Sequence, residues 1–225
     1  MTTDPRGPFE SGRPSRQVEQ VEQVGPVEPG ELVEPGELVE PGELVERVDE
    51  HDRVLGVVER GEAIRRGWLH RVATTVCRDP SGRVLVHRRP DGAGRFGGCH
   101  DVMLGGALRV GESYAAGARR ELAEELGVSV PVRHRFTFLC RGAIAPYWLG
   151  VHEAVLPPDL IAPDAVDPAA VARYGWLTLP ELAGAVRRWP FVPDGQVAFR
   201  RYLLGLPSGA GGVDHGGVGA EPGPG

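Results

Sequence analysis

Three glutamates, Glu121, Glu124 and Glu125, stand within five consecutive residues of the chain. On a helix that turns about 100° per residue their carboxylates share one face. Carboxylates one turn apart repel each other by a few tenths of a kcal/mol, and a solvated acidic face is the simplest explanation of such a cluster. The other explanation is a hard divalent cation, which binds oxygen ligands and leaves room for water and substrate phosphate. The cluster alone favours the solvated face, and the residues around it decide in favour of a Mg²⁺ site, with Mn²⁺ as an alternative ion.

The helix that carries these glutamates is the clearest one in the sequence, and it is predicted over Ser113–Leu126. Ser113 suits the N-cap, where its hydroxyl accepts a backbone N–H, and Gly127 suits the left-handed position after the last turn. Apolar residues form one stripe along this helix, which we expect to pack inward. They are Ala115, Ala118, Leu122 and Leu126.

The residues around the cluster follow a fixed spacing, G-x5-E-x7-R-E-L-x-E-E-x-G-V. This pattern resembles the signature of the Nudix hydrolases at every defined position. Similarity extends over roughly residues 46–204, through VLVHRRPDG and FGGCHDVMLGG, and resembles the branch that includes the isopentenyl diphosphate isomerase-like hydrolases. The residues of the signature are Gly106, Glu112, Arg120, Glu121, Leu122, Glu124, Glu125, Gly127 and Val128.

The resemblance implies an α/β/α sandwich and a metal-dependent attack of water on a small-molecule diphosphate. The substrate class it implies is a nucleoside diphosphate derivative or a related organic diphosphate. Carried over residue by residue, the resemblance implies that the metal ligands are Glu121, Glu124 and Glu125, together with the Gly105 carbonyl. It also implies a part in catalysis for Glu124, Glu125 and Arg120, and a role for Glu112 and Arg120 in orienting the loop and the ligand carboxylates.

The general base is a separate question, because Nudix proteins use different bases. Two candidates stay open: a glutamate of the helix, and Glu153 on the strand predicted at Tyr147–Val155. A phosphate-binding group is expected from Arg88 and Arg89, which end a strand before the loop leading to the signature. Adjacent residues of a strand point to opposite faces, so we expect only one of the two arginines to face the substrate.

Two other functions are weighed against hydrolysis. Prenyl diphosphate isomerases of the same branch carry a catalytic cysteine at the position of Gly105, and Cys99 lies six residues too early to replace it. A non-catalytic ligand-sensing module has no need of all three carboxylates. Cys99, His100 and Asp101 are predicted to have structural or loop roles, because adjacent residues on an extended segment point apart and could not easily act on each other.

The elements that must position these residues indicate an α+β domain with a mixed sheet. A hairpin is predicted from two strands joined by the turn Asp79-Pro80-Ser81-Gly82, and Thr178-Leu-Pro-Glu181 resembles a capping box. The predicted strands are His70–Arg78, Arg83–His87, His134–Arg141, Tyr147–Val155 and Tyr174–Thr178, and the later helices are Thr178–Arg188 and Asp194–Leu204.

Composition divides the chain into three parts. Residues 1–46 form an acidic leader with three VEPGEL repeats and residues 206–225 a Gly-rich tail, and both are predicted to be disordered. Residues 47–205 then form the folded domain. The whole chain has a net charge of −6, whereas residues 1–50 carry −9, so the remainder carries only +3. This charge is too small to indicate nucleic-acid binding.

The location of the protein is predicted from what the chain lacks. No apolar run approaches the roughly 18–20 residues of a membrane span, so no membrane association is expected. The three cysteines are widely spaced and form no CxxC pair, which favours reduced thiols and a cytoplasmic protein. Many relatives form dimers, so the resemblance is also compatible with a homodimer.

Overall fold

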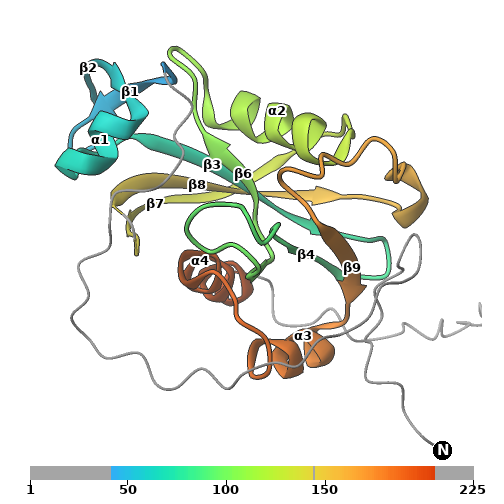
Figure 1. The fold of residues 1–225 in the computed structure, drawn as a ribbon. Coiled ribbons are helices and arrows are strands. Elements are labelled where there is room, and N and C mark those ends of the chain that lie inside the picture. Colours follow the sequence, from blue (N-terminus) through green and yellow to red (C-terminus); the bar gives the residue numbers. More distant parts are fainter. Residues whose placement is uncertain (1–41, 144, 206–225) are drawn as a thin grey trace, which may run out of the picture.

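The structure, a computed structural model, describes residues 42–143 and 145–205, and its centre is a seven-stranded mixed sheet (Figure 1). The main order of strands is β5-β4-β3-β8-β7, with β6 paired to β3 and β9 paired to β4. β3 and β8 run parallel, and the other pairs are antiparallel. The strands are β3 (Arg71–Arg78), β4 (Val84–Arg88), β5 (His100–Asp101), β6 (Leu104–Ala107), β7 (Arg133–Arg141), β8 (Pro146–Val155) and β9 (Arg173–Leu177).

Helices cover both faces of this sheet (Figure 1). On one face, α2 (Tyr114–Leu126) buries Leu122 and Leu126 against Cys77 of β3 and Ala154 of β8. On the other face, α3 (Leu179–Val186) and α4 (Pro193–Leu204) enclose a second cluster of buried residues with β3, β4 and β8. The predicted α+β class and the α/β/α sandwich with a mixed sheet are confirmed.

Local capping explains why α2 begins and ends where it was predicted. The Ser113 hydroxyl accepts a hydrogen bond from the Ala116 N–H at 3.3 Å, and Gly127 has the left-handed φ of 67°. Thr178 and Glu181 form both bonds of the predicted capping box at the start of α3. These signals act within one turn of helix, so the sequence shows them directly.

A small unit precedes the sheet and was not predicted as secondary structure. β1 (Leu44–Val48) and β2 (Val54–Glu59) pair antiparallel, and α1 (Arg60–Arg66) follows them. β1 begins three residues before the predicted domain start at residue 47, because Val45 pairs with Val58 and is completely buried. Residues 1–41 of the predicted leader and the predicted tail at 206–225 lie outside the described residues.

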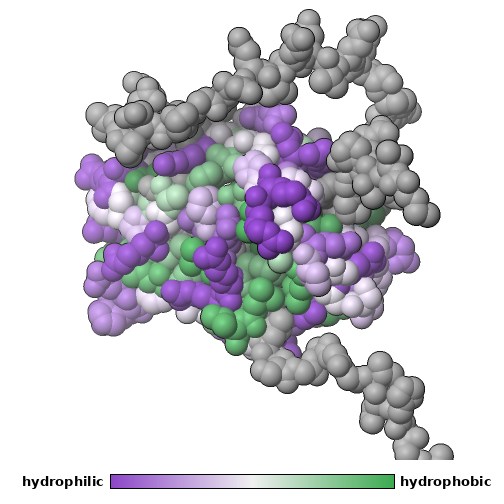
Figure 2. Space-filling view, turned by 90° about the horizontal axis from the view of Figure 1, so that it is seen from below, coloured by the Kyte–Doolittle hydropathy of each residue, from purple (hydrophilic) through white to green (hydrophobic). Residues whose placement is uncertain are grey.

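η1 (Pro158–Leu160) is a single 3-10 turn between β8 and β9. None of the helices in the described ranges is long and apolar enough to cross a membrane. Where the face shown in Figure 2 is not grey, hydrophilic and hydrophobic patches lie beside each other, so that face is not uniformly hydrophilic.

Candidate active site

The three glutamates of α2 do not share one environment. Glu121 is mostly buried, with 13% of its side chain exposed, whereas Glu124 is 47% exposed. Arg120 Nη1 donates to Glu121 at 2.7 Å and to Glu124 at 2.9 Å, and Arg109 also donates to Glu124, at 2.8 Å. Arginines therefore already hold two of the three carboxylates, and Glu124 is directed toward solvent.

Arg120 also connects the helix to the loop before it. Its guanidinium donates to both carboxylate oxygens of Glu112, and Nη2 donates to the Ala107 carbonyl at 3.0 Å. These bonds to Glu112 raise the pKa of Arg120 and lower that of Glu112, so both groups are charged. The orienting role predicted for Glu112 and Arg120 is compatible with these contacts.

Glu125 is the carboxylate without a complete set of partners. The backbone N–H of Gly105 donates to it, but its Oε2 atom is buried and has no hydrogen-bond partner among the described residues. Burial, and then the nearby charge of Glu121, raise the pKa of Glu125 well above its ordinary value, while Arg89 opposes that rise. Burial also raises the pKa of Glu121. Of these two carboxylates, Glu121 is paired with Arg120, whereas one oxygen of Glu125 has no partner among the described residues.

Gly105 and Gly106 of β6 allow these carboxylates to approach the sheet. Gly105 has a φ of 149°, and a Cβ atom there would lie 2.1 Å from the Ala73 carbonyl oxygen. A Cβ atom on Gly106 would lie 2.6 Å from Glu121 Oε1. A side chain at Gly105 would collide with backbone, and one at Gly106 would displace the Glu121 carboxylate, so this glycine pair allows a close approach of strand and helix.

Gly105 and Gly106 of β6 and Glu121 and Glu125 of α2 together form what we call the metal corner. Its fit to a metal ion rests on Glu121 and Glu125. Within residues 42–143 and 145–205 no group of three Asp, Glu, His or Cys side chains is close enough to hold an ion as the side chains lie. The expected set of three carboxylates is therefore not preformed. An unpartnered buried oxygen on Glu125 beside a second buried carboxylate is nevertheless the hard-donor environment that Mg²⁺ requires.

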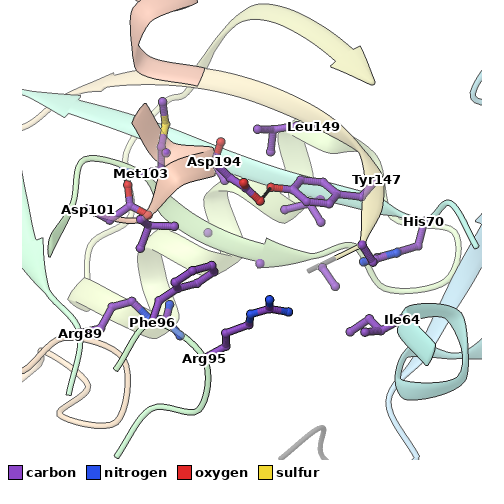
Figure 3. A pocket seen from close by; sticks show the side chains of 18 of the residues that line it. Ile64, His70, Arg89, Arg95, Phe96, Asp101, Met103, Tyr147, Leu149 and Asp194 are labelled. Atoms are coloured by element: carbon purple, nitrogen blue, oxygen red, sulfur yellow. Dashed lines mark hydrogen bonds between the residues drawn. The ribbon is translucent and has the colours of Figure 1, made fainter. Parts of the chain in front are cut away.

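A cavity of about 190 Å³ opens beside this corner (Figure 3). Its wall includes Gly105, Gly106 and Glu125 at the metal corner, and Val72 and Leu149 on the central strands. The loop from Pro90 to Cys99, α1 and the start of α4 also contribute side chains to the wall. The cavity therefore lies between the site signature and three segments that the signature does not contain.

The two candidate arginines have separate positions, as the alternation of a strand predicts. Arg89 lines the cavity, and its Nε atom has no partner in the described part of the chain. Its positive charge opposes the rise that burial causes in the pKa values of Glu125 and Asp101. Arg88 instead forms an ion pair with Asp91. Arg89 is thus the partly buried cation available to an anionic ligand.

Several other polar atoms around the cavity have no partner among the residues described, although they are buried. Buried polar groups are normally hydrogen-bonded, so a group of exceptions in one place indicates a ligand or water site. Burial lowers the pKa of His70 to about 4 and that of His87 to about 3, so both imidazoles are neutral. These atoms are Arg60 Nε, His70 Nδ1, Thr74 Oγ1 and His87 Nδ1.

The acidic end of the cavity was missed by sequence reasoning. Asp101 was predicted to have a structural or loop role; it is buried and accepts hydrogen bonds from the N–H groups of Val102 and Met103, but it also lines the cavity. Burial raises the pKa of Asp101 to about 7. Asp194, at the start of α4, accepts from the Tyr147 hydroxyl at 2.9 Å (Figure 3). An acid within the apolar run after Cys99 was the available signal for Asp101.

Glu153 lies elsewhere. It is on β8, but it bonds the Tyr202 hydroxyl of α4 and lies 3.7 Å from Arg135. The following residue, Ala154, packs with α2 on the other face of the sheet. Glu153 does not line the cavity, so the structure does not bring this candidate base to the glutamates of α2.

Among the residues described, the cavity wall contains no cysteine that could take part in catalysis. Cys77 and Cys140 are buried in the two hydrophobic clusters, and Cys99 is partly buried in the loop. None of the three cysteines is among the residues that line the cavity.

Comparison with known proteins agrees with this geometry. The family model of the NUDIX domain matches residues 68–195. A Nudix hydrolase of Streptomyces coelicolor, SCO1686, is 41% identical over 157 residues, which are 68% of this chain and 84% of that protein. The prenyl-diphosphate phosphatase of Methanosarcina mazei is 32% identical over 149 residues, 64% of this chain and 84% of that protein.

A solved structure has the same fold. The crystal structure of DR0079 from Deinococcus radiodurans superposes with a TM-score of 0.60 and 28% sequence identity, over 71% of this chain and 98% of that one.

Proposed function

The chain belongs to the Nudix hydrolase family, and from this premise we propose that it hydrolyses the diphosphate linkage of a small organic diphosphate in a Mg²⁺-dependent reaction. One observation carries the proposal: the partly unpartnered carboxylate of Glu125 and the partly unpartnered guanidinium of Arg89 line the same cavity. An anion-binding group beside a cation-binding group is the arrangement that a metal-bound diphosphate needs.

Each side chain then has a defined task. Glu121 and Glu125 hold the ion, which when bound neutralises diphosphate oxygens and lowers the pKa of a water molecule. Arg89 binds the diphosphate from the opposite wall. Glu112 holds Arg120, which in turn keeps Glu121 in position. Glu124 lies at the solvent side of the helix.

The proton acceptor is assigned to α2 rather than to β8. Glu153 contacts Tyr202 and Arg135 and does not line the cavity, which supports a base on the helix instead. A glutamate of α2 is therefore the candidate base.

The isomerase alternative is disfavoured by the cavity itself. Gly105 occupies the place of the isomerase cysteine, and a larger residue there would collide with Ala73. Since no cysteine lines the cavity, a thiol-dependent proton transfer has no donor. Prenyl diphosphates still belong among the substrates to be tried, because one relative is named as a prenyl-diphosphate phosphatase.

The test is a substrate panel. The protein is incubated with nucleoside diphosphate sugars, isopentenyl diphosphate and dimethylallyl diphosphate in Mg²⁺, in Mn²⁺ and in EDTA. We expect release of phosphate or nucleotide from at least one class in Mg²⁺ and none in EDTA. Conversion of isopentenyl to dimethylallyl diphosphate would instead identify an isomerase, and ligand binding without turnover would identify a sensing module.

A further inference from the structure

Phe96 has an unusual backbone conformation in the loop between β4 and β5. Its φ is 70°, in the left-handed region that bulky side chains rarely adopt. The loop is closed tightly around it: Cys99 N–H donates to the Phe96 carbonyl at 3.1 Å, and Gly98 N–H donates to the Pro90 carbonyl at 3.2 Å. A Cβ atom on Gly97 would lie 2.4 Å from the Asp91 carbonyl oxygen. The loop therefore fixes Phe96 in a strained state.

Strained residues persist where the surrounding structure holds them, and they are frequent at binding sites. The phenyl ring of Phe96 belongs to none of the four hydrophobic clusters found in the described residues. It lines the cavity instead, with Arg89 and Asp101 near it in Figure 3. Core packing thus does not explain why the chain keeps an aromatic residue in this conformation.

The rest of the cavity wall indicates what the ring is for. Met103 and Leu149 line the cavity as well and present aliphatic side chains (Figure 3). Arg95, the preceding residue, also lines it, and its guanidinium lies 5.9 Å from the centre of the Phe96 ring. An aromatic ring, an apolar wall and a cation fit an apolar or flat group that is attached to an anion.

We propose that Phe96 determines substrate specificity by packing its ring against the flat, unsaturated part of the organic group attached to the diphosphate. This inference rests on the proposed function, because it takes the diphosphate to lie at Arg89. Two kinds of group share the required chemistry, a nucleobase and the alkene of a prenyl chain. Both present a π-face to the ring.

The test compares Phe96→Gly with Phe96→Tyr. Glycine adopts a positive φ without strain, so Phe96→Gly should melt at the same temperature as the wild type or higher, while KM rises on the order of tenfold from the lost apolar contact. We expect kcat to change less than KM. Phe96→Tyr keeps the ring and should retain a KM near that of the wild type.

Inorganic diphosphate provides the matched probe. It lacks the organic group, so its inhibition constant should be equal in Phe96→Gly and in the wild type. The substrate class whose KM rises identifies the group that the ring contacts. A lower melting temperature with an unchanged KM for every class would show that Phe96 is only structural and would overturn the inference.

Failure of the proposed function gives a different result. In that case the wild type hydrolyses no member of the panel. Binding of each organic diphosphate is then measured by the shift that it causes in the melting temperature of the protein. A smaller shift in Phe96→Gly than in the wild type still supports the role of the ring, and equal shifts overturn it.

Discussion

Arg120 and Glu112 form a two-point ion pair that links α2 to the loop before it. Arg120 Nε donates to Glu112 Oε1 at 2.9 Å, and Nη2 donates to Oε2 at 2.8 Å. Both side chains are largely buried, with 16% and 14% exposed. Because the same guanidinium holds Glu121 at 2.7 Å, the position of a carboxylate at the metal corner depends on a residue of the preceding loop.

Glu112→Gln should therefore weaken both stability and activity. It removes the charge that holds Arg120, and we expect the free energy of unfolding to fall by about 2 kcal/mol. Urea unfolding measures this change. Glu62→Gln is the matched control, since its ion pair with Arg66 on α1 is far more exposed and contributes only about 0.3 kcal/mol. Equal losses in the two variants would contradict the role of the buried pair.

Glu125→Gln should separate activity from stability. The amide keeps the shape of the side chain but removes a charge that has too few partners, so we expect the melting temperature to be unchanged or higher. We expect kcat/KM to fall on the order of 100-fold, and the Mg²⁺ concentration for half-maximal rate to rise. An unchanged rate and Mg²⁺ dependence would remove Glu125 from the metal site.

Arg88 and Arg89 allow a comparison of neighbours. Arg89→Ala removes the cation that lines the cavity, and KM for the diphosphate should rise roughly tenfold to a hundredfold. Arg88→Ala only breaks a pair with the exposed carboxylate of Asp91, so KM should stay the same and stability should change by less than about 1 kcal/mol. Steady-state kinetics on both variants decides between them, and a larger KM effect for Arg88 would reverse the assignment.

Glu153→Gln should change stability without changing catalysis. Its carboxylate bonds Tyr202 and approaches Arg135, so the substitution should lower the free energy of unfolding by about 1–2 kcal/mol. We expect kcat to remain within about twofold, since Glu153 lies outside the cavity. A much lower kcat at an unchanged melting temperature would restore Glu153 as the base.

The buried imidazole of His87 should make stability depend on pH. Burial lowers its pKa to about 3 in the folded state, against about 6.5 in the unfolded chain. Between these values the unfolded chain binds more protons, so this contribution to stability is complete above pH 6.5 and is lost as the pH falls. Asp101, whose pKa is raised to about 7, acts in the opposite direction between about pH 4 and 7.

Urea unfolding at several pH values between about 4.5 and 7.5 measures how the free energy of unfolding changes with pH. For each titrating histidine the slope is at most about 1.4 kcal/mol per pH unit. His87→Gln should lose less stability than the wild type as the pH falls, because glutamine takes up no proton. Parallel curves for the two proteins would show that His87 does not titrate in this way.

Local patterns were sufficient wherever a signal acts within one turn or one hairpin. Ser113 and Gly127 mark the ends of α2, and Thr178 starts α3, because caps bond backbone groups only a few residues away. The unit of β1, β2 and α1 was not predicted. Its helix has seven residues and no side-chain cap, so contacts made by Val45 and Ala63 with the rest of the domain stabilise it.

The order of residues along the chain was enough to determine the family, the fold class and the helix that carries Glu121, Glu124 and Glu125. Tertiary structure alone decided which of them is buried, that Arg89 rather than Arg88 faces the cavity, and that Glu153 lies under α4. The reason is that burial and charge depend on neighbours from distant segments. Asp101 and Asp194 come to one cavity only because the sheet brings β5 against the start of α4.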